Sequence, residues 1–142
     1  MAGDDQTGIT IRGAVPADTE AIGACIEPFV ERGKLLPRTM AELEILLPDC
    51  FVAELEGRIV GCAALEIYSR KLADLRSLVV APELQGKGIG KRLVHACIER
   101  AREKNVLEVM AITSSEEFFR SCGFDFTLPG EKKALFIQTR EV

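Results

Sequence analysis

The segment from residue 78 to residue 104 constrains the fold more than any other part of the chain. Leu78, Val79 and Val80 predict the end of a buried strand, and apolar positions at helical spacing over residues 89–104 predict an amphipathic helix. The loop between them has a glycine at every second position from 86 to 90. Glycines let a ligand approach the backbone closely, and the first turn of a helix presents unpaired N–H groups. The junction therefore predicts a cradle for a phosphate group.

Basic residues beside these glycines stand out against the composition of the whole chain. The 142 residues carry a net charge of −4, which gives no indication of nucleic-acid binding. Lys87, Lys91 and Arg92 nevertheless gather at the junction and add positive charge to the predicted anion site. The glycine spacing fits neither the dinucleotide-binding fingerprint nor a P-loop, which ends in Gly-Lys-Ser or Gly-Lys-Thr.

Periodicity and turn signals predict alternating strands and helices in one domain. Residues 1–8 are polar and predict a flexible N-terminal tail, followed by a single domain over residues 9–142. Helices are expected from about residue 18 to 32 and over 40–47, 89–104 and 115–121, the second with a capping box at Thr39 and Glu42. Strands are expected over 9–13, 50–56, 58–68, 72–80, 106–112, 124–127 and 134–139. This order predicts a mixed α/β layer architecture.

Cysteine and histidine usage argues against a metal site. The five cysteines include no close pair with ligand spacing, and His95, the single histidine, fits helix packing or the surface better than catalysis. Scattered cysteines without a secretion signal favour a cytoplasmic location. The longest apolar stretch, residues 59–65, is too short to cross a membrane, so we expect no membrane partner.

The segment from Gln85 to Gly90 resembles the Gln/Arg-x-x-Gly-x-Gly/Ala signature of the GNAT superfamily of N-acetyltransferases. It follows a strand and opens a helix, as that family requires. Residues 117–124 resemble the family's Phe-Tyr-x-x-x-Gly-Phe segment, and the order of elements matches from Ile9 to Thr139. The resemblance implies a single-domain α/β (α+β) fold whose mixed, mostly antiparallel sheet of about six or seven strands is flanked by about four helices.

A closer resemblance is to the acetyltransferase domain of N-acetylglutamate synthases. It is carried by residues 33–39, by the Gly-Cys-Ala-Ala-Leu run at 61–65, and by an acidic residue before the strand that ends in Val80, Ala81 and Pro82. The match is typical of the short, stand-alone form without an amino-acid kinase domain. It implies the first step of arginine biosynthesis, the acetylation of glutamate.

The GNAT resemblance implies acetyl-CoA as co-substrate and no metal. The pyrophosphate is expected on the backbone amides of residues 85–91, and the pantetheine arm along the strand edge at 78–80. The residues implied in this binding are Leu78, Val79, Val80, Gln85, Gly86, Lys87, Gly88, Ile89, Gly90, Lys91 and Phe119.

Asp74 falls where several GNAT enzymes carry a glutamate base, and an ammonium must lose a proton before it attacks a thioester. A solvated carboxylate at a strand end, or a partner of Arg76, is the alternative interpretation. Phe119 departs from the family, because many members carry there a tyrosine that acts as general acid. Tyr68, the chain's only tyrosine, fits an ordinary half-buried strand residue better than a site residue.

Arg38, Lys71 and Ser114 are the residues predicted to bind the acceptor. Arg38 matches an arginine of the synthases and offers bidentate recognition of a carboxylate. Lys71 lies near a lysine of the synthases, whereas Lys34 reads as a solvated side chain. Ser114 lies in a loop where some synthases have a basic residue, which weakens the case for glutamate as acceptor.

These predictions describe an acetyltransferase that acts on a primary amine bearing a carboxylate, best the α-amino group of glutamate. Another amino acid, a polyamine, an antibiotic or a protein N-terminus is the alternative acceptor. A non-catalytic acetyl-CoA sensor is the alternative outside the enzyme class, and Phe119 keeps it open. The resemblance also implies a homodimer.

Overall fold

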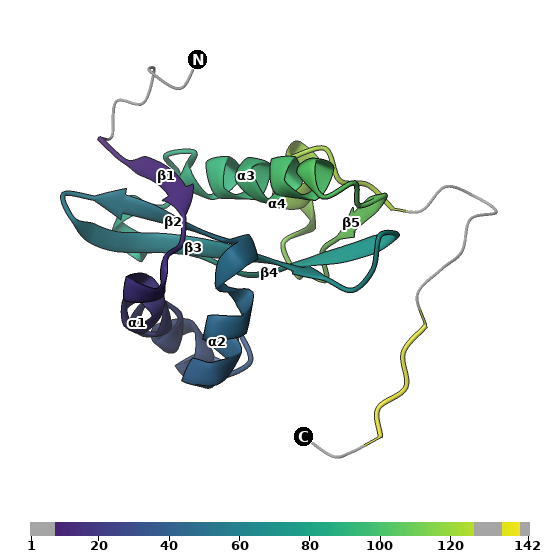
Figure 1. The fold of residues 1–142 in the computed structure, drawn as a ribbon, viewed down its shortest axis with the longest axis horizontal. Coiled ribbons are helices and arrows are strands. Elements are labelled where there is room, and N and C mark those ends of the chain that lie inside the picture. The colour runs from purple at the N-terminus through teal and green to yellow at the C-terminus, as the bar shows by residue number, and fades with distance from the viewer. Residues whose placement is uncertain (1–7, 127–134, 140–142) are drawn as a thin grey trace.

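The computed structural model describes residues 8–126 and 135–139 of the chain. In this part, a five-stranded sheet lies between two layers of helices (Figure 1). The strands are β1 (Thr10–Gly13), β2 (Cys50–Leu55), β3 (Arg58–Ile67), β4 (Leu72–Val80) and β5 (Glu108–Met110). The α-helices are α1 (Thr19–Glu31), α2 (Met40–Leu46), α3 (Ile89–Glu103) and α4 (Glu116–Ser121). The α+β class, the mixed sheet and the four helices are therefore confirmed.

The sheet runs in the order β1-β2-β3-β4-β5 and is antiparallel up to β4. Strand β5 is parallel to β4 and pairs with it only over residues 72–74. Beyond Asp74, β4 continues for six residues without a β5 partner in the described chain. The two strands therefore diverge and leave one edge of β4 open.

A bulge bends β4 within this open stretch. Cys62 pairs with Val79 and Ala64 pairs with Arg76, so that two residues of β4 face one residue of β3. Ser77 takes a positive φ of 56° in the bulge, and its carbonyl accepts a hydrogen bond from the Cys62 thiol at 3.4 Å. The bulge therefore lies in the part of β4 that β5 does not pair with.

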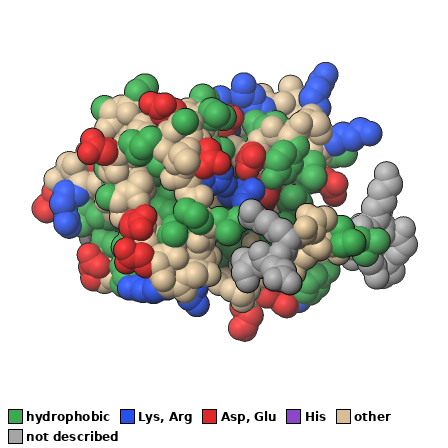
Figure 2. Space-filling model, turned by 90° about the horizontal axis from the view of Figure 1, so that it is seen from below, with side chains coloured by type: hydrophobic (Ala, Val, Ile, Leu, Met, Phe, Trp, Pro, Cys, Tyr) green, Lys and Arg blue, Asp and Glu red, His purple; other side chains and the backbone are tan. Residues whose placement is uncertain are grey.

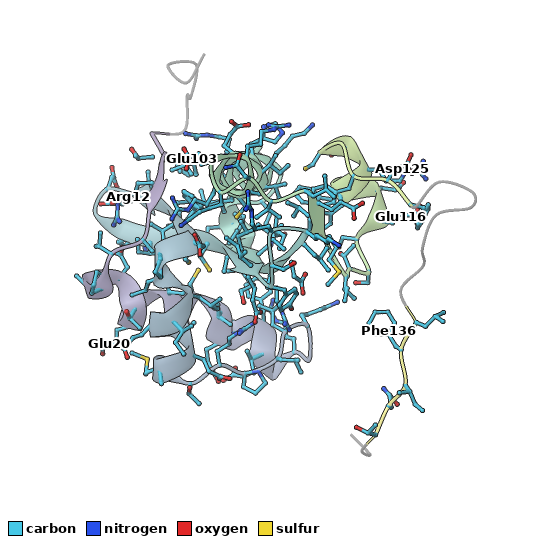
Figure 3. All side chains as sticks on the ribbon, turned by 45° about the vertical axis from the view of Figure 1, so that its right-hand side comes forward. Arg12, Glu20, Glu103, Glu116, Asp125 and Phe136 are labelled. Carbon is cyan, nitrogen blue, oxygen red and sulfur yellow. The ribbon has the colours of Figure 1, made fainter. Side chains whose placement is uncertain are left out.

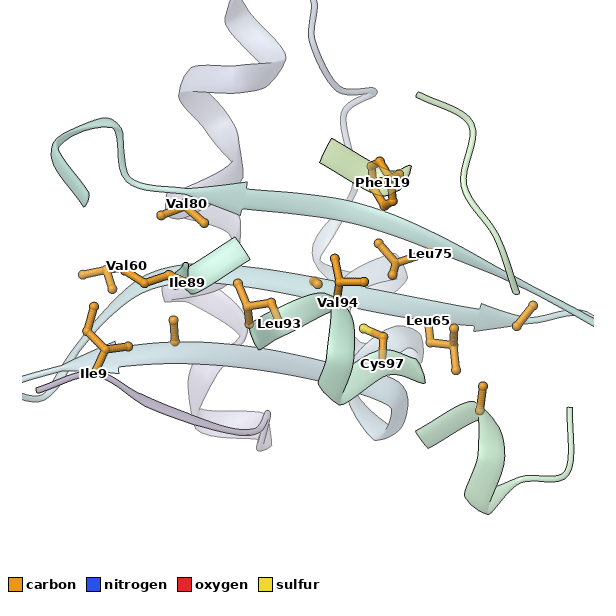
Figure 4. Packing of buried hydrophobic residues seen from close by; sticks show 14 residues of the cluster. Ile9, Val60, Leu65, Leu75, Val80, Ile89, Leu93, Val94, Cys97 and Phe119 are labelled. Carbon is orange, nitrogen blue, oxygen red and sulfur yellow. The ribbon is translucent and has the colours of Figure 1, made fainter. Parts of the chain in front are cut away.

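Two apolar clusters hold the helices on the sheet. On one face, Leu93, Val94 and Cys97 of α3 pack onto Leu65 and Val80 of the sheet (Figure 4). Burial of each large side chain contributes about 1.5–3 kcal/mol. On the other face, α1 and α2 pack through the cluster that contains Ile22, Ile26, Leu43 and Leu46. Figure 2 shows the α1–α2 side, on which acidic, basic and apolar side chains are interspersed, unlike the basic stripe of a nucleic-acid-binding surface.

Local signals place the ends of α1 and α2. Thr39 and Glu42 form the predicted capping box: the Thr39 hydroxyl accepts from the Glu42 amide at 3.1 Å, and the Thr39 amide donates to the Glu42 carboxylate at 2.8 Å. Gly33 has a positive φ of 73° just after α1, which suits a glycine. Residues 29–36, which form the end of α1 and the start of the segment that leads to α2, lie alongside the open edge of β4.

The last two predicted strands are wrong within the described residues. Residues 124–126 form no strand, because the Phe124 amide donates to the Phe119 carbonyl at 3.1 Å and the Phe126 amide to the Asp125 side chain at 2.8 Å. Residues 135–139 also form no strand, and Phe136 lies outside the layers of helix and sheet (Figure 3). An alternating apolar pattern makes a strand only where another strand satisfies its backbone groups.

The described chain thus has five strands rather than six or seven. Strand β5 is also shorter than the predicted 106–112. Thr127, Ala134 and most of the predicted N-terminal tail lie outside the described residues.

Candidate functional site

A cleft of about 1330 Å³ opens where β4 and β5 diverge. Its walls are β4 from Asp74 to Val80, the glycine loop with the first turn of α3, residues 112–115, the aromatic side of α4, and the segment between α1 and α2. Most of the predicted site residues line it: Asp74, Leu78, Val79, Val80, Gln85, Gly86, Gly88, Ile89, Gly90, Lys91, Ser114 and Phe119. Lys87, Arg38 and Lys71 are not among the lining residues.

The glycine loop has the shape of an anion cradle. Gly86 and Gly88 have φ values of 82° and 83°, which residues with a Cβ adopt only with strain. Gln85 donates from its side-chain amide to the Val80 carbonyl at 3.0 Å and so ties the loop to the end of β4. Helix α3 begins at Ile89, directly after Gly88. The unpaired amides of its first turn and the positive end of its dipole therefore face the cleft.

Aromatic side chains of α4 close the cleft on the cradle side. A Cβ at Gly90 would lie 3.3 Å from the Phe118 ring, so α3 and α4 approach closely there. Phe119 is buried and packs edge-on against Phe118 and Phe124, with ring centroids 5.1 and 5.3 Å away. Phe119 therefore forms part of the apolar cleft wall and also packs in the core. Its ring has no hydroxyl that could act as general acid.

Asp74 is a buried carboxylate, 4% exposed, at one end of the β4 wall of the cleft. Burial raises its pKa above the ordinary range. A hydrogen bond from Tyr68 at 3.2 Å and the charge of Arg76, whose Nε lies 3.8 Å away, oppose this effect. The rise nevertheless prevails, and it makes Asp74 a better proton acceptor than an ordinary surface aspartate.

A chain of ion pairs connects Asp74 to Arg38. Arg76 donates to Glu66 at 3.3 Å, and Arg38 approaches the same Glu66 oxygen at 3.9 Å. Arg38 thus belongs to the charged network of the site without lining the cleft. Lys71 lies in the β3–β4 turn, where its carbonyl accepts from the Glu108 amide at 3.0 Å.

Four lining residues with ionisable side chains were not among the predicted site residues: Arg32, Lys34, Tyr68 and Arg76. For Lys34 the sequence favoured a solvated side chain, and for Tyr68 an ordinary strand residue. Side chains two positions apart on a strand lie on the same face of the sheet, so the spacing of Arg76 from Asp74 could have indicated that Arg76 lines the cleft. Glu66 lies directly opposite Asp74 in the register of β3 and β4. No local signal marks Arg32, and the sequence could not distinguish Lys34 from a solvated lysine, because only the tertiary packing of the α1–α2 segment brings both to the cleft.

No three histidine, cysteine or acidic side chains lie close enough to hold a metal ion among residues 8–126 and 135–139. Within the same residues, no helix is long and apolar enough to cross a membrane.

Comparison with known families decides the class of this site. Residues 24–124 match the acetyltransferase (GNAT) family. The chain belongs to that family. The GNAT chain is an N-acetyltransferase that uses acetyl-CoA, and its strand–cradle–helix junction lies within the matched region.

Several relatives of this GNAT chain are amino-acid acetyltransferases. It is 36% identical over 114 residues to an uncharacterized N-acetyltransferase of Chlorobaculum tepidum, which covers 80% of this chain and 74% of that protein. It is 32% identical over 118 residues to an amino-acid acetyltransferase of Mycobacterium tuberculosis, covering 80% of this chain and 67% of that protein. It is 33% identical to an amino-acid acetyltransferase of Neisseria meningitidis but spans only 27% of its length.

Solved structures support the same relationship. Rv2747 from Mycobacterium tuberculosis, in complex with CoA and NLQ, superimposes with a TM-score of 0.78 at 30% identity, over 88% of this chain and 76% of that one. N-acetylglutamate synthase from Neisseria gonorrhoeae, complexed with coenzyme A and N-acetyl-glutamate, superimposes with a TM-score of 0.74 at 31% identity. That match covers 80% of this chain and 27% of the synthase chain.

Proposed function

We propose that this GNAT chain transfers an acetyl group from acetyl-CoA to the amino group of a carboxylate-bearing acceptor, best L-glutamate. The observation that carries the proposal is that the cradle, the buried Asp74 and the cations Arg32, Lys34 and Arg76 line one cleft. The cradle suits the donor's pyrophosphate, Asp74 suits the acceptor's ammonium, and the cations suit its carboxylates.

The donor would lie along the cradle and β4. The amides of residues 88–91 bind the pyrophosphate, with Lys91 adding charge, and the pantetheine follows the open edge at 78–80. Backbone N–H groups at this edge would polarise the thioester carbonyl as negative charge develops on its oxygen. Phe119 would pack against the pantetheine.

The acceptor arrives as an ammonium ion, which has no lone pair for attack. Asp74 takes one proton from it, and the free amine attacks the thioester carbonyl. Collapse of the tetrahedral intermediate breaks the carbon–sulfur bond and CoA leaves as a thiolate, while the attacking nitrogen releases its second proton to solvent and the neutral amide forms. The raised pKa of Asp74 brings its basicity closer to that required near neutral pH.

Cations at the acceptor end would select a carboxylate. Arg32 and Lys34 lie on the α1–α2 side of the cleft, and Arg76 lies two residues from Asp74. Arg38, Lys71 and Ser114 stay part of the proposal, Arg38 through its ion pair with Glu66. The amino-acid acetyltransferases among the relatives, and the N-acetyl-glutamate bound to the gonococcal synthase, support glutamate. Such a reaction belongs to arginine biosynthesis.

An acceptor screen tests the proposal. Purified protein is incubated with acetyl-CoA and one acceptor at a time: glutamate, other amino acids, spermidine, an aminoglycoside or a peptide with a free N-terminus. Release of free CoA thiol gives kcat/KM for each. We expect glutamate to exceed amines without a carboxylate by at least about 100-fold, since such acceptors leave the cations of the cleft without a partner. A polyamine or aminoglycoside as best acceptor would overturn the choice of substrate class.

A further inference from the structure

Tyr68 is placed where it can act on the reaction through Asp74. It follows the last residue of β3, and its amide donates to the Leu72 carbonyl at 3.0 Å, which sets the start of the β3–β4 turn. Its side chain is half-exposed and lines the cleft. The ring therefore adds little to the core, while its hydroxyl points at the one buried carboxylate of the cleft wall.

The hydroxyl contacts one oxygen of Asp74 and leaves the other available. Tyr68 donates to Oδ2 at 3.2 Å, and Arg76 approaches the same oxygen at 3.8 Å. Both side-chain contacts that the structure describes for Asp74 are therefore made to Oδ2, and neither is made to Oδ1. Two groups anchored on one oxygen restrict rotation of the carboxylate about its Cβ–Cγ bond.

We propose that Tyr68 is a positioning residue of the acetyl transfer, which holds Oδ2 of Asp74 so that Oδ1 receives the proton of the acceptor's ammonium. This inference rests on Asp74 as the base, as proposed above. During the step the proton moves from the ammonium nitrogen to Oδ1, and Tyr68 keeps its own proton. Oδ2 accepts from Tyr68 both before and after the transfer, so the carboxylate need not reorient.

Of the other charged groups that face Asp74, only Arg76 also contacts this hydroxyl, to which its guanidinium donates a hydrogen bond. Arg76 lies on β4 itself, and Glu66 lies opposite on β3. Arg38, before α2, reaches Glu66, and the β5 partner of Asp74 is the uncharged Met110. Removal of the Tyr68 hydroxyl leaves Arg76 its ion pairs with Glu66 at 3.3 Å and Asp74 at 3.8 Å, so the charges around Asp74 remain.

The test is the isosteric substitution Tyr68→Phe, with kcat and both KM values measured across pH. We expect kcat to fall about 10-fold, with KM for acetyl-CoA unchanged within about twofold. The lost hydrogen bond favoured the charged carboxylate, so the acidic limb of the kcat/KM profile should move about half a unit to higher pH. An unchanged profile would overturn the inference.

Ser69→Ala is the matched control, because it removes a hydroxyl from the same turn. The Ser69 hydroxyl accepts from the Lys71 amide at 3.0 Å and does not contact Asp74. We expect wild-type kinetics from this variant. The same acid-limb shift in Ser69→Ala would assign the effect to the shape of the turn and contradict the role of Tyr68.

A double-mutant cycle with Asp74→Asn separates the two proposals. If Asp74→Asn alone keeps wild-type kcat, the base assignment fails, and the inference fails with it. If Asp74→Asn is nearly inactive and adding Tyr68→Phe changes its residual rate by less than about twofold, Tyr68 acts through Asp74. A further 10-fold loss in that background would show that Tyr68 acts independently of Asp74. Thermal melts of all variants verify folding.

Discussion

Burial of the Asp74 carboxylate suits its proposed role as a base but lowers the stability of the folded protein at neutral pH. Its pKa is raised by burial, so the folded protein holds this proton more tightly than the unfolded chain does. The contribution of Asp74 to stability is therefore fully present below its ordinary pKa and is lost as pH rises through the raised value. At neutral pH the ionised carboxylate opposes folding, as expected of a group kept for its chemistry.

Asp74→Asn should reveal both effects. The amide keeps the shape of the carboxylate but cannot take the ammonium proton, so we expect kcat to fall about 10²–10⁴-fold. We expect the melting temperature at pH 7 to be equal to or above that of the wild type. Steady-state kinetics and a thermal melt measure the two effects. Retention of more than about a tenth of kcat would contradict the assignment of Asp74 as base.

The cysteines differ in reactivity according to their burial. Burial raises the pKa of Cys50 and Cys97 to about 12, and contact with Cys25 together with burial raises that of Cys62. The same contact lowers the pKa of Cys25, which is half-buried on α1, as Cys122 is half-buried beyond α4. A thiolate is needed for reaction with an aromatic disulfide reagent.

We therefore expect Cys25 and Cys122 to be labelled first in the folded protein, and the three buried thiols at least about 100-fold more slowly. Mass mapping of labelled peptides over time measures this order, and labelling in denaturant provides the control. Equal rates at all five sites without denaturant would contradict the burial described here. The order matters for any assay that reads free CoA thiol in the presence of this protein.

At the scale of elements, the start of α3 depends on a loop conformation that favours glycine. A Cβ at Gly88 would meet nothing within 4 Å, so the difficulty of a side chain there lies in the backbone and not in space. The left-handed conformation disfavours alanine by about 1–2 kcal/mol. An alanine at position 88 would relieve this strain by leaving the left-handed conformation, and this change would turn the first amides of α3 away from the cleft.

Gly88→Ala should therefore raise KM for acetyl-CoA about 10-fold with a smaller effect on kcat, as measured by initial rates at varied acetyl-CoA. Gly57→Ala is the matched control, since Gly57 has a φ of 79°, lies in the β2–β3 turn and also has open space around its Cβ. We expect the control to lose a similar amount of stability and to keep its KM. An equal rise in KM in both variants would trace the effect to general destabilisation.

At the scale of the whole molecule, we expect a single cleft to bind both substrates. Its volume of about 1330 Å³ exceeds the usual range of about 300–1,000 Å³ for one small ligand. The described residues that line it include neither a cysteine nor a histidine, so neither an activated thiol nor a Ser–His pair is present there to carry an acetyl group. We therefore expect direct transfer within a ternary complex.

Initial rates at varied acetyl-CoA and acceptor should then give intersecting reciprocal plots. Intact-mass analysis after incubation with acetyl-CoA alone should show no acetylated protein, because no covalent intermediate forms. Parallel plots together with an acetyl-enzyme would be the signature of a double-displacement route and would rule out direct attack.

Interactions within a few residues were predictable from the sequence. The helix over residues 40–47 follows from the Thr39 capping box, and the strand over 72–80 follows from its apolar run; both lie where predicted to within a residue. The cradle was equally readable, because glycines and a helix start act locally. The last two strands were wrong because an apolar pattern cannot specify which strand will pair with it.

The sequence by itself determined the order of the elements from β1 to α4, the glycine loop before α3 and a carboxylate at position 74, because each depends on neighbouring residues. Only the tertiary structure decided what surrounds that carboxylate. The pairing of β3 with β4 brings Glu66 and Tyr68 to Asp74, and the cleft that Tyr68 and Asp74 line opens where β4 and β5 diverge. Packing of the α1–α2 segment then adds Arg32 and Lys34. These contacts join distant parts of the chain, and burial, which raises the pKa of Asp74, exists only once they have formed.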